Sequence, residues 1–225
     1  MSAQTEPCPR DLCAPTEFLD YEEPPVQDFL ARALPQRGRP MQQLAVDLYY
    51  AIRDGIQYAI YGVDLARRSM RASAVVERGQ GLCIHKSILY AACARALGIP
   101  SQLAFVDVRN HVASPRLKLL LGGDVVHYHC YARLHMGGRW INVTPVFSAR
   151  LCQLYRMKPL EFDGRSDAVL QPYDEHGSAH MELVRSHGAF DDLPYGEVIA
   201  GLRHAHPMIF AGPTRVRRGS LTAEA

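Results

Sequence analysis

The chain has 225 residues, of which 48% are hydrophobic and 21% are charged, with a formal net charge of only +2. This composition is typical of a globular protein that can bury one substantial core. Because the net charge is small and the basic residues are scattered, it gives no field that would favour nucleic acid as a partner.

The two ends of the chain differ in composition from its body. Residues 1–15 and 212–225 are rich in Pro, Ser, Thr, Gly and charge and lack apolar periodicity, so we expect both tails to be disordered. Residues 16–211 contain no internal repeat and no linker-like stretch, which predicts a single domain.

The first half of this domain shows helical patterns. Apolar residues at four-residue spacing predict helices over residues 26–34 and 41–53, and a short helix over 71–78 that ends at Gly79. The next predicted helix, residues 83–97, is apolar on almost every side, which indicates a buried central helix.

The second half reads mainly as sheet. Strands are predicted over residues 102–108, 125–136 and 139–143, and residues 151–206 predict one or two short helices among loops. Helices followed by an antiparallel sheet, without alternating βαβ units, predict an α+β fold with a helix packed on the sheet.

The Gly137-Gly138 pair predicts a two-residue hairpin turn and sets the register of its strands. Met136 then faces Arg139, and Tyr131 faces Thr144. By the two-residue period, one face carries polar groups: His127, His129, Tyr131, Arg133, His135, Trp140, Asn142 and Thr144. A histidine on this face can serve as a base for a nucleophile from elsewhere, although a solvated outer face of the sheet gives the same pattern.

Cys83 is the candidate nucleophile. It opens the predicted central helix, where unsatisfied N–H groups favour the thiolate and are expected to lower its pKa. Its backbone N–H and the Gln80 side-chain amide are candidate donors to an oxyanion. The alternative is a core thiol. With no run of about 18 apolar residues, no signal-peptide pattern and no disulfide-like cysteine spacing, we expect a cytoplasmic protein with free thiols and no membrane partner.

Two segments together resemble the transglutaminase-like superfamily, which includes transglutaminases, peptide N-glycanases and microbial cysteine proteases. They are GLCIHKSILYAACARALGIPSQLAFV and HCYARLHMGGRWINVTP, within residues 72–147. Flanking stretches such as FLDYEEPPVQDFL and PLEFDG are similar to a bacterial subgroup of that family. The resemblance implies a papain-like α+β fold in which a central helix carrying the Cys packs against an antiparallel sheet carrying the His.

The resemblance also implies site residues. Cys83 falls on the catalytic Cys and His129 on the catalytic His, while Thr144 stands where the family has the Asp of a Cys-His-Asp triad. A Thr hydroxyl can orient His129 but brings no charge to stabilise its imidazolium. Other orienting groups remain open: Asn142 on the same face, or a carboxylate such as Asp107 or Asp163.

These residues predict cysteine-dependent acyl transfer through an acyl-Cys83 intermediate on an amide or thioester carbonyl. The substrate would be a peptide, amide or thioester, with Gln80, Tyr131 and Asn142 as substrate or oxyanion contacts. The outcome is hydrolysis, as in a protease or amidase, or amide formation. No cofactor is expected.

Three alternatives remain. One is a biosynthetic cyclase or acyltransferase acting on a carrier-bound acyl group. The second is a non-catalytic binding module with a degenerate triad. The third is a metal site, for which the imidazoles and thiolate at positions 83, 85, 127, 129 and 135 have the right ligand chemistry but no compact motif such as CxxC.

Overall fold

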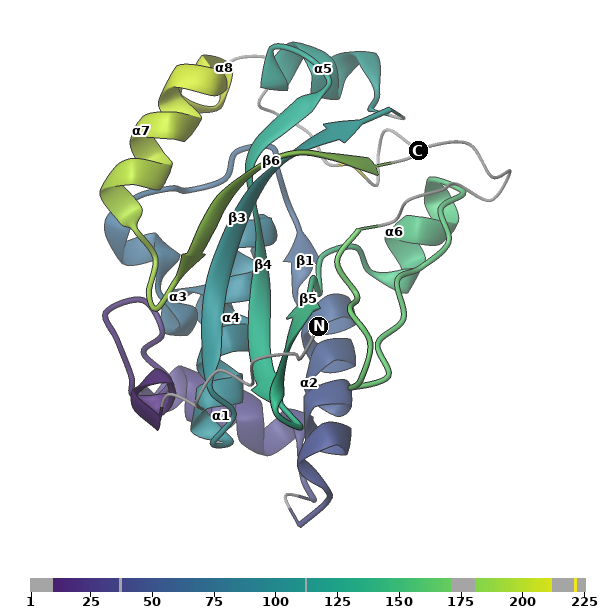
Figure 1. Ribbon diagram of the computed structural model, residues 1–225. Coiled ribbons are helices and arrows are strands. Elements are labelled where there is room, and N and C mark those ends of the chain that lie inside the picture. The colour runs from purple at the N-terminus through teal and green to yellow at the C-terminus, as the bar shows by residue number, and fades with distance from the viewer. Residues whose placement is uncertain (1–9, 37, 112, 171–180, 212–220, 222–225) are drawn as a thin grey trace, which may run out of the picture.

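The computed structural model describes residues 10–36, 38–111, 113–170, 181–211 and 221. Its centre is a four-stranded antiparallel sheet in the order β5-β4-β3-β6. The strands are β3 (Ser101–Asn110), β4 (Val125–Met136), β5 (Arg139–Val143) and β6 (Met181–Phe190). Figure 1 shows the long strands β3 and β4 running side by side through the middle of the molecule.

The helix α4 (Cys83–Ala96) packs on β4 and β3, and residues 83–95 are all buried. Other helices surround α4 and the sheet. They are α1 (Pro24–Ala33), α2 (Met41–Gly55), α3 (Ala72–Arg78), α5 (Pro115–Leu121), α6 (Ala149–Leu154), α7 (Tyr195–Ala205) and α8 (Pro207–Phe210), with the 3-10 turns η1 (Arg10–Cys13) and η2 (Arg67–Met70). The predicted α+β class, with a central helix on an antiparallel sheet, is therefore confirmed.

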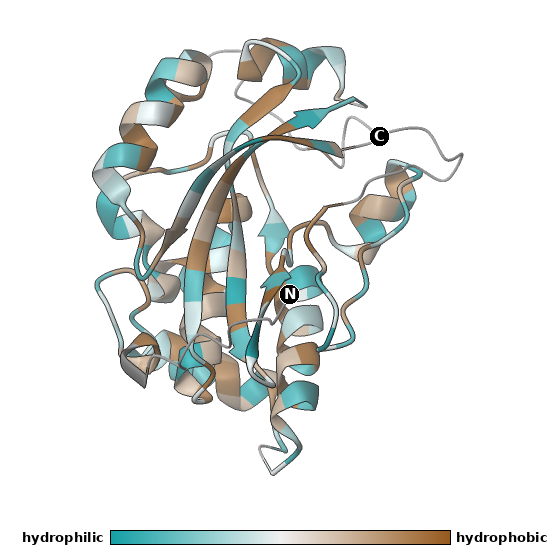
Figure 2. Cartoon of the chain, viewed as in Figure 1, coloured by the Kyte–Doolittle hydropathy of each residue, from teal (hydrophilic) through white to brown (hydrophobic). Residues whose placement is uncertain are grey.

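The predicted hairpin is confirmed in position, and its register is confirmed from Ala132–Val143 to Met136–Arg139; the predicted Tyr131–Thr144 pair is wrong, because β5 ends at Val143 and the Thr144 N–H donates to the Ala168 carbonyl. β4 and β5 are joined at Gly137 and Gly138, which both have positive φ, and Met136 pairs with Arg139. Burial alternates along this part of β4. Cys130, Ala132 and Leu134 are buried towards the core, and Tyr131 and Arg133 between them are only partly buried. Figure 2 shows the corresponding alternation of hydrophobic and hydrophilic residues along the strand.

The predicted alternation is wrong beyond His129. Val106 pairs with His129 but Val108 pairs with Val126, so β4 holds an extra residue in a bulge, where Tyr128 has a φ of 55°. The bulge removes His127 from the face that carries His129. Its Nδ1 instead lies 3.1 Å from Asp107 Oδ2.

Three segments differ from the sequence expectations. The sequence predicts loops and short helices over residues 151–206, but Met181–Phe190 form the edge strand β6. Most of the β6 side chains are exposed, and the strand joins the sheet through backbone pairing with β3. η1, within the expected N-terminal tail, is part of the fold, and Leu12 in it is buried. Of residues 212–225, only Leu221 is described, and it is buried.

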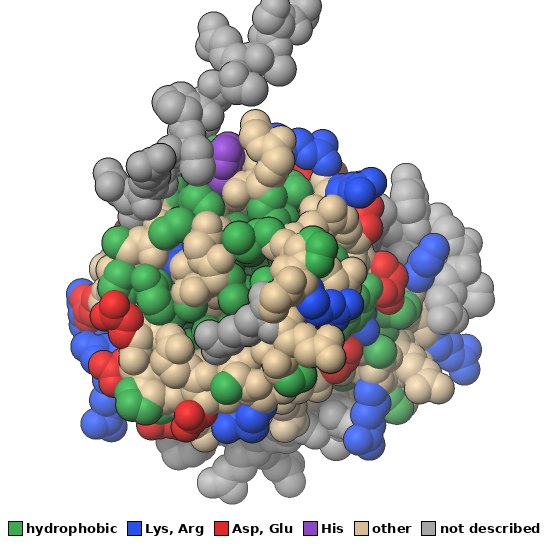
Figure 3. Space-filling view, turned by 90° about the horizontal axis from the view of Figure 1, so that it is seen from below, with side chains coloured by type: hydrophobic (Ala, Val, Ile, Leu, Met, Phe, Trp, Pro, Cys, Tyr) green, Lys and Arg blue, Asp and Glu red, His purple; other side chains and the backbone are tan. Residues whose placement is uncertain are grey.

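The face seen from below Figure 1 carries hydrophobic side chains gathered near its centre, with charged side chains around them (Figure 3). Met41, at the start of α2, is among the exposed large hydrophobic residues of the chain. Among the described helices, none is both long enough and apolar enough to cross a membrane.

Candidate active site

A short parallel pair of strands leads the chain into Cys83. β1 (Gln57–Tyr58) pairs with β2 (Gln80–Gly81), so that Tyr58 lies opposite Gly81. Gly79 ends α3 in the left-handed conformation, which a glycine adopts without strain. The chain can therefore reverse within four residues and begin α4 at Cys83.

His85 closes the first turn of α4. Its Nδ1 accepts a hydrogen bond from the Leu82 N–H at 3.2 Å, and its Nε2 lies 3.2 Å from the Asp64 carbonyl oxygen. The ring is therefore neutral with the proton on Nε2, and burial lowers its pKa to about 4. A Cβ on Gly81 would lie 2.4 Å from His85 Cβ, so only glycine fits beside this ring. His85 thus holds the helix start and is not available as a metal ligand.

The Cys83 thiol is protonated at rest. Burial raises its pKa to about 11, although the backbone N–H groups of Cys130, Ile84 and Cys83 itself act in the opposite direction. The expectation that the helix start lowers this pKa is therefore wrong for the ligand-free protein, because desolvation outweighs the helix N–H groups. The N–H of Cys130 places the thiol beside the residue that directly follows His129.

His129 is a buried and neutral imidazole. Burial alone lowers its pKa to about 4. Among the described residues, its Nε2 has no hydrogen-bond partner, and the same is true of the buried Thr144 Oγ1. Both residues line a small cavity of about 10 Å³. The fold thus brings Thr144 and His129 to one cavity without a hydrogen bond between them.

No carboxylate within the described part of the chain forms an ion pair or hydrogen bond with His129. Asp107 accepts from His187 Nε2 at 2.7 Å and from the Tyr128 N–H at 3.1 Å. Asp163 accepts from the backbone N–H groups of Arg165 and Ser166. The two carboxylates considered from the sequence are therefore engaged elsewhere.

The remaining predicted contacts lie around the site. Asn142 donates its backbone N–H and its Nδ2 to Asp167 at 2.9 and 2.8 Å. Tyr131 is half-buried, and burial raises its pKa. The Gln80 side chain is exposed on β2. No described hydrogen bond joins any of these three to Cys83 or His129.

The alternative metal ligands are not brought together. His127 contacts Asp107, and His135 packs edge-on against Trp140 at 5.2 Å between ring centroids. Within the described ranges, no group of three or more His, Cys, Asp or Glu side chains is arranged to hold a metal ion.

Sequence reasoning missed two residues near Cys83. Tyr58 pairs with Gly81 two residues before Cys83, and burial, followed by the charge of Cys83, raises the pKa of its hydroxyl. Lys86, one turn after Cys83, is fully buried and donates to the carbonyls of Arg53, Ile56 and Val146 at 2.9, 2.7 and 2.8 Å. No sequence pattern around Tyr58 indicates a role for it. Lys86, in contrast, could have been found from the sequence, because it is a charged residue within an apolar helix.

The family model of the transglutaminase-like superfamily matches residues 28–145, more than half of the 225 residues. Among solved structures, the chain is similar to a crystal structure from Cytophaga hutchinsonii that is provisionally named a cysteine protease. The identity is 14% and the TM-score is 0.46, and the similarity covers 79% of this chain and 52% of the other. The chain thus spans about half the length of that structure. No curated protein matches it.

Proposed function

The chain belongs to the transglutaminase-like superfamily, and we propose that it is a cysteine-dependent acyl-transfer enzyme in which Cys83 attacks an amide or thioester carbonyl. Membership in this superfamily supports cysteine-dependent catalysis in general. The substrate class and the fate of the acyl group are part of the proposal.

The observation that best supports this function is the placement of Cys83 at the start of α4 against the strand that carries His129. The thiol faces the N–H of Cys130, and the next residue back along β4 is the buried imidazole. Both partners are neutral at rest, which favours general-base activation over a resting thiolate–imidazolium pair.

In the proposed reaction, His129 takes the thiol proton while the Cys83 sulfur forms a bond to the carbonyl carbon. The oxyanion forms beside the backbone N–H of Cys83, with Gln80 or Tyr58 as a second donor. The proton then passes from His129 to the leaving amine or thiol as the C–N or C–S bond breaks. Water or an amine attacks the acyl-Cys83 thioester, and the thiol regains its proton.

A non-catalytic binding module is the second candidate. The high pKa of Cys83 and the absence of a described carboxylate at His129 favour it, because both weaken the catalytic pair. The two candidates differ in whether Cys83 forms a covalent adduct.

Intact-mass analysis after incubation with a panel of amides, thioesters and peptides tests the proposal. We expect an acyl adduct that Cys83→Ser abolishes, that His129→Ala lowers at least about 100-fold in rate, and that Cys93→Ser leaves unchanged. Cys93 is the matched control because it is buried in the same helix. An adduct that persists in Cys83→Ser would rule out this nucleophile, and no adduct with any acyl donor would favour the binding module.

A further inference from the structure

An apolar cavity of about 70 Å³ has His129 in its wall. It lies between the upper part of β4, the start of α5 and the segment around α6. Tyr58, which pairs with Gly81 two residues before Cys83, also lines it. The cavity therefore adjoins His129, whereas Cys83 is not among the described residues that line it.

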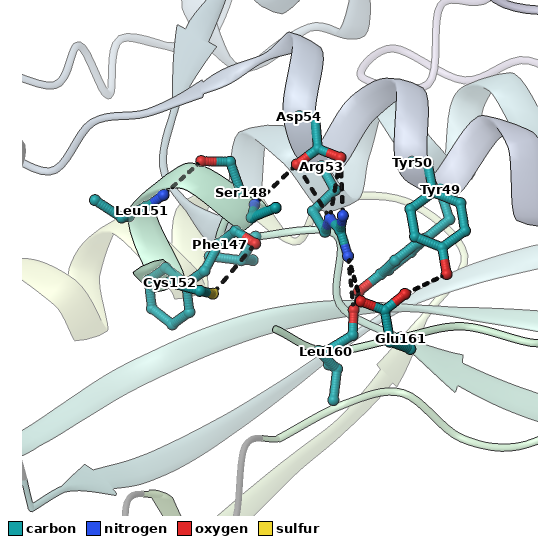
Figure 4. Close-up of polar contacts among 12 residues, drawn as sticks. Tyr49, Tyr50, Arg53, Asp54, Phe147, Ser148, Leu151, Cys152, Leu160 and Glu161 are labelled. Carbon is teal, nitrogen blue, oxygen red and sulfur yellow. Dashed lines mark hydrogen bonds and ion pairs between the residues drawn. The ribbon is translucent and has the colours of Figure 1, made fainter. Parts of the chain in front are cut away.

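The wall formed by residues 147–151 is held in place by polar contacts with α2. Ser148 caps α6 by accepting from the Leu151 N–H at 3.2 Å, and Asp54 Oδ1 accepts from the Ala149 N–H at 2.9 Å (Figure 4). The Phe147 ring packs edge-on against Tyr58 at 5.0 Å. The cavity is thus formed before any ligand enters.

The cavity suits an uncharged group. Among the described residues that line it there is no Asp, Glu, Lys or Arg, and the His129 imidazole is held neutral by burial. A charged side chain would lose its hydration there without gaining a partner, which is costly. Leu117, Leu121 and Val126 provide aliphatic surface instead.

Leu221 shows what kind of group fits. It lines the cavity with 8% of the residue exposed, although it lies eleven residues beyond the end of α8. Tyr155 Oη donates a hydrogen bond to its main-chain carbonyl at 2.8 Å. A leucine side chain therefore packs in the cavity wall, with a hydroxyl donor next to it that binds a main-chain carbonyl.

We propose that this cavity is the recognition pocket for a leucine-like residue of a peptide substrate, and that Leu221 occupies part of it until the substrate enters. The inference rests on the proposed function for the role of the bound peptide, and binding itself needs no reaction. Tyr155 donates to the substrate's main-chain carbonyl as it does to Leu221. Removing the Leu221 side chain therefore frees space and apolar surface for the substrate.

Binding is measured in the Cys83→Ser background, so that chemistry plays no part. N-acetyl-L-leucine methylamide is titrated while the NMR signals of the His129 ring are followed, with N-acetyl-L-aspartate methylamide as the charged comparison. We expect the leucine probe to bind and the aspartate probe to bind at least about tenfold more weakly. We also expect Leu221→Ala to tighten leucine-probe binding about tenfold. Leu183→Ala is the matched control, because Leu183 is an exposed leucine on β6 outside the cavity.

A second variant fills the cavity from another wall. Ala113→Phe, in protein confirmed as folded by circular dichroism, is expected to weaken leucine-probe binding at least about tenfold. Equal binding of the two probes, or no effect of both Leu221→Ala and Ala113→Phe, would overturn the proposal. Selective leucine binding without any acyl adduct on Cys83 would retain the pocket and reject the enzyme. An acyl adduct on Cys83 without selective leucine binding would retain the enzyme and reject the leucine pocket.

Discussion

Burial sets the protonation state of the two residues proposed to react. Cys83 and His129 are both removed from water, which raises the thiol pKa to about 11 and lowers the imidazole pKa to about 4. Neither residue has a described charged partner that would reverse these shifts. Thr144 offers only an uncharged hydroxyl, and its Oγ1 has no hydrogen-bond partner within the part of the chain that the structure describes.

Restoring a carboxylate at position 144 tests this account. Thr144→Asp places a negative charge in the cavity that His129 lines, and we expect it to raise the pKa of His129 by about 1–3. The pH titration of the His129 ring by NMR measures the change. Thr144→Val, which has nearly the same shape and no charge, is the control. An unchanged titration in Thr144→Asp would mean that the two side chains are too far apart to interact.

Lys86 is the clearest case of a buried charge that has a structural role. Its ammonium group has three N–H donors and meets three carbonyls, from the end of α2 and from Val146. Burial lowers its pKa to about 7. Lys86 thereby ties α2 and the segment after β5 to the helix that carries Cys83.

We expect Lys86→Met to lower the free energy of unfolding by about 3 kcal/mol or more, because it leaves three buried carbonyls without their donor. Urea denaturation measures the loss. Lys118→Met, at an exposed position of α5, is the control and should stay within about 0.5 kcal/mol. A similarly small effect of Lys86→Met would show that water replaces the ammonium group.

At the scale of elements, the start of α4 depends on the close approach of β2. Gly81 packs on the His85 ring, and the adjacent Leu82 N–H is bonded to that ring. These contacts set the position from which Cys83 projects. The hairpin brings Thr144 to the end of β5, while the bulge in β4 directs His127 away towards Asp107.

Gly81→Ala should therefore disturb the site. Its Cβ would lie 2.4 Å from His85 Cβ and 2.8 Å from Cγ, so we expect a loss of about 1–3 kcal/mol in the free energy of unfolding and a displaced Cys83. Thermal unfolding and the rate of acyl-Cys83 formation report these two effects. Gly196→Ala, in α7, where the added Cβ meets no described atom within 4 Å apart from its chain neighbours and the adjacent helix backbone, should be neutral or stabilising. If Gly81→Ala behaves like this control, the contact with His85 does not position the helix.

At the scale of the whole molecule, the buried histidines make stability depend on pH. The pKa values of His85 and His129 are lowered from 6.5 to about 4 in the folded protein. Between these values the unfolded chain binds more protons than the folded one. The free energy of unfolding therefore falls as the pH decreases from 6.5 to 4.

Each histidine contributes on the order of 3 kcal/mol to this loss. Urea denaturation at a series of pH values between 7 and 4 measures it. His129→Gln removes one of these titrating groups and should reduce the loss by on the order of 3 kcal/mol, while His85 and His206, whose pKa values burial also lowers, remain. A loss of the same size in His129→Gln would show that His129 does not remain neutral in the folded protein.

The sequence by itself determined the parts of this protein that depend on local chemistry. The apolar run of residues 83–97 predicted α4, and Gly137-Gly138 predicted the turn and register of the β4–β5 hairpin, which the structure confirms. The two motifs on these elements also predicted the family, which the match over residues 28–145 confirms. The roles of Cys83, His129 and Thr144 remain predictions.

Only the tertiary structure decided the features that depend on residues distant in sequence. The bulge at Tyr128 and the edge strand β6 arise from pairing with β3, which leaves no periodic signal in their own residues. The protonation of Cys83 depends on how deeply the surrounding chain buries it, and Tyr58 and Leu221 reach the site from remote segments. Turn and helix preferences act over a few residues, whereas burial and strand pairing are properties of the assembled fold.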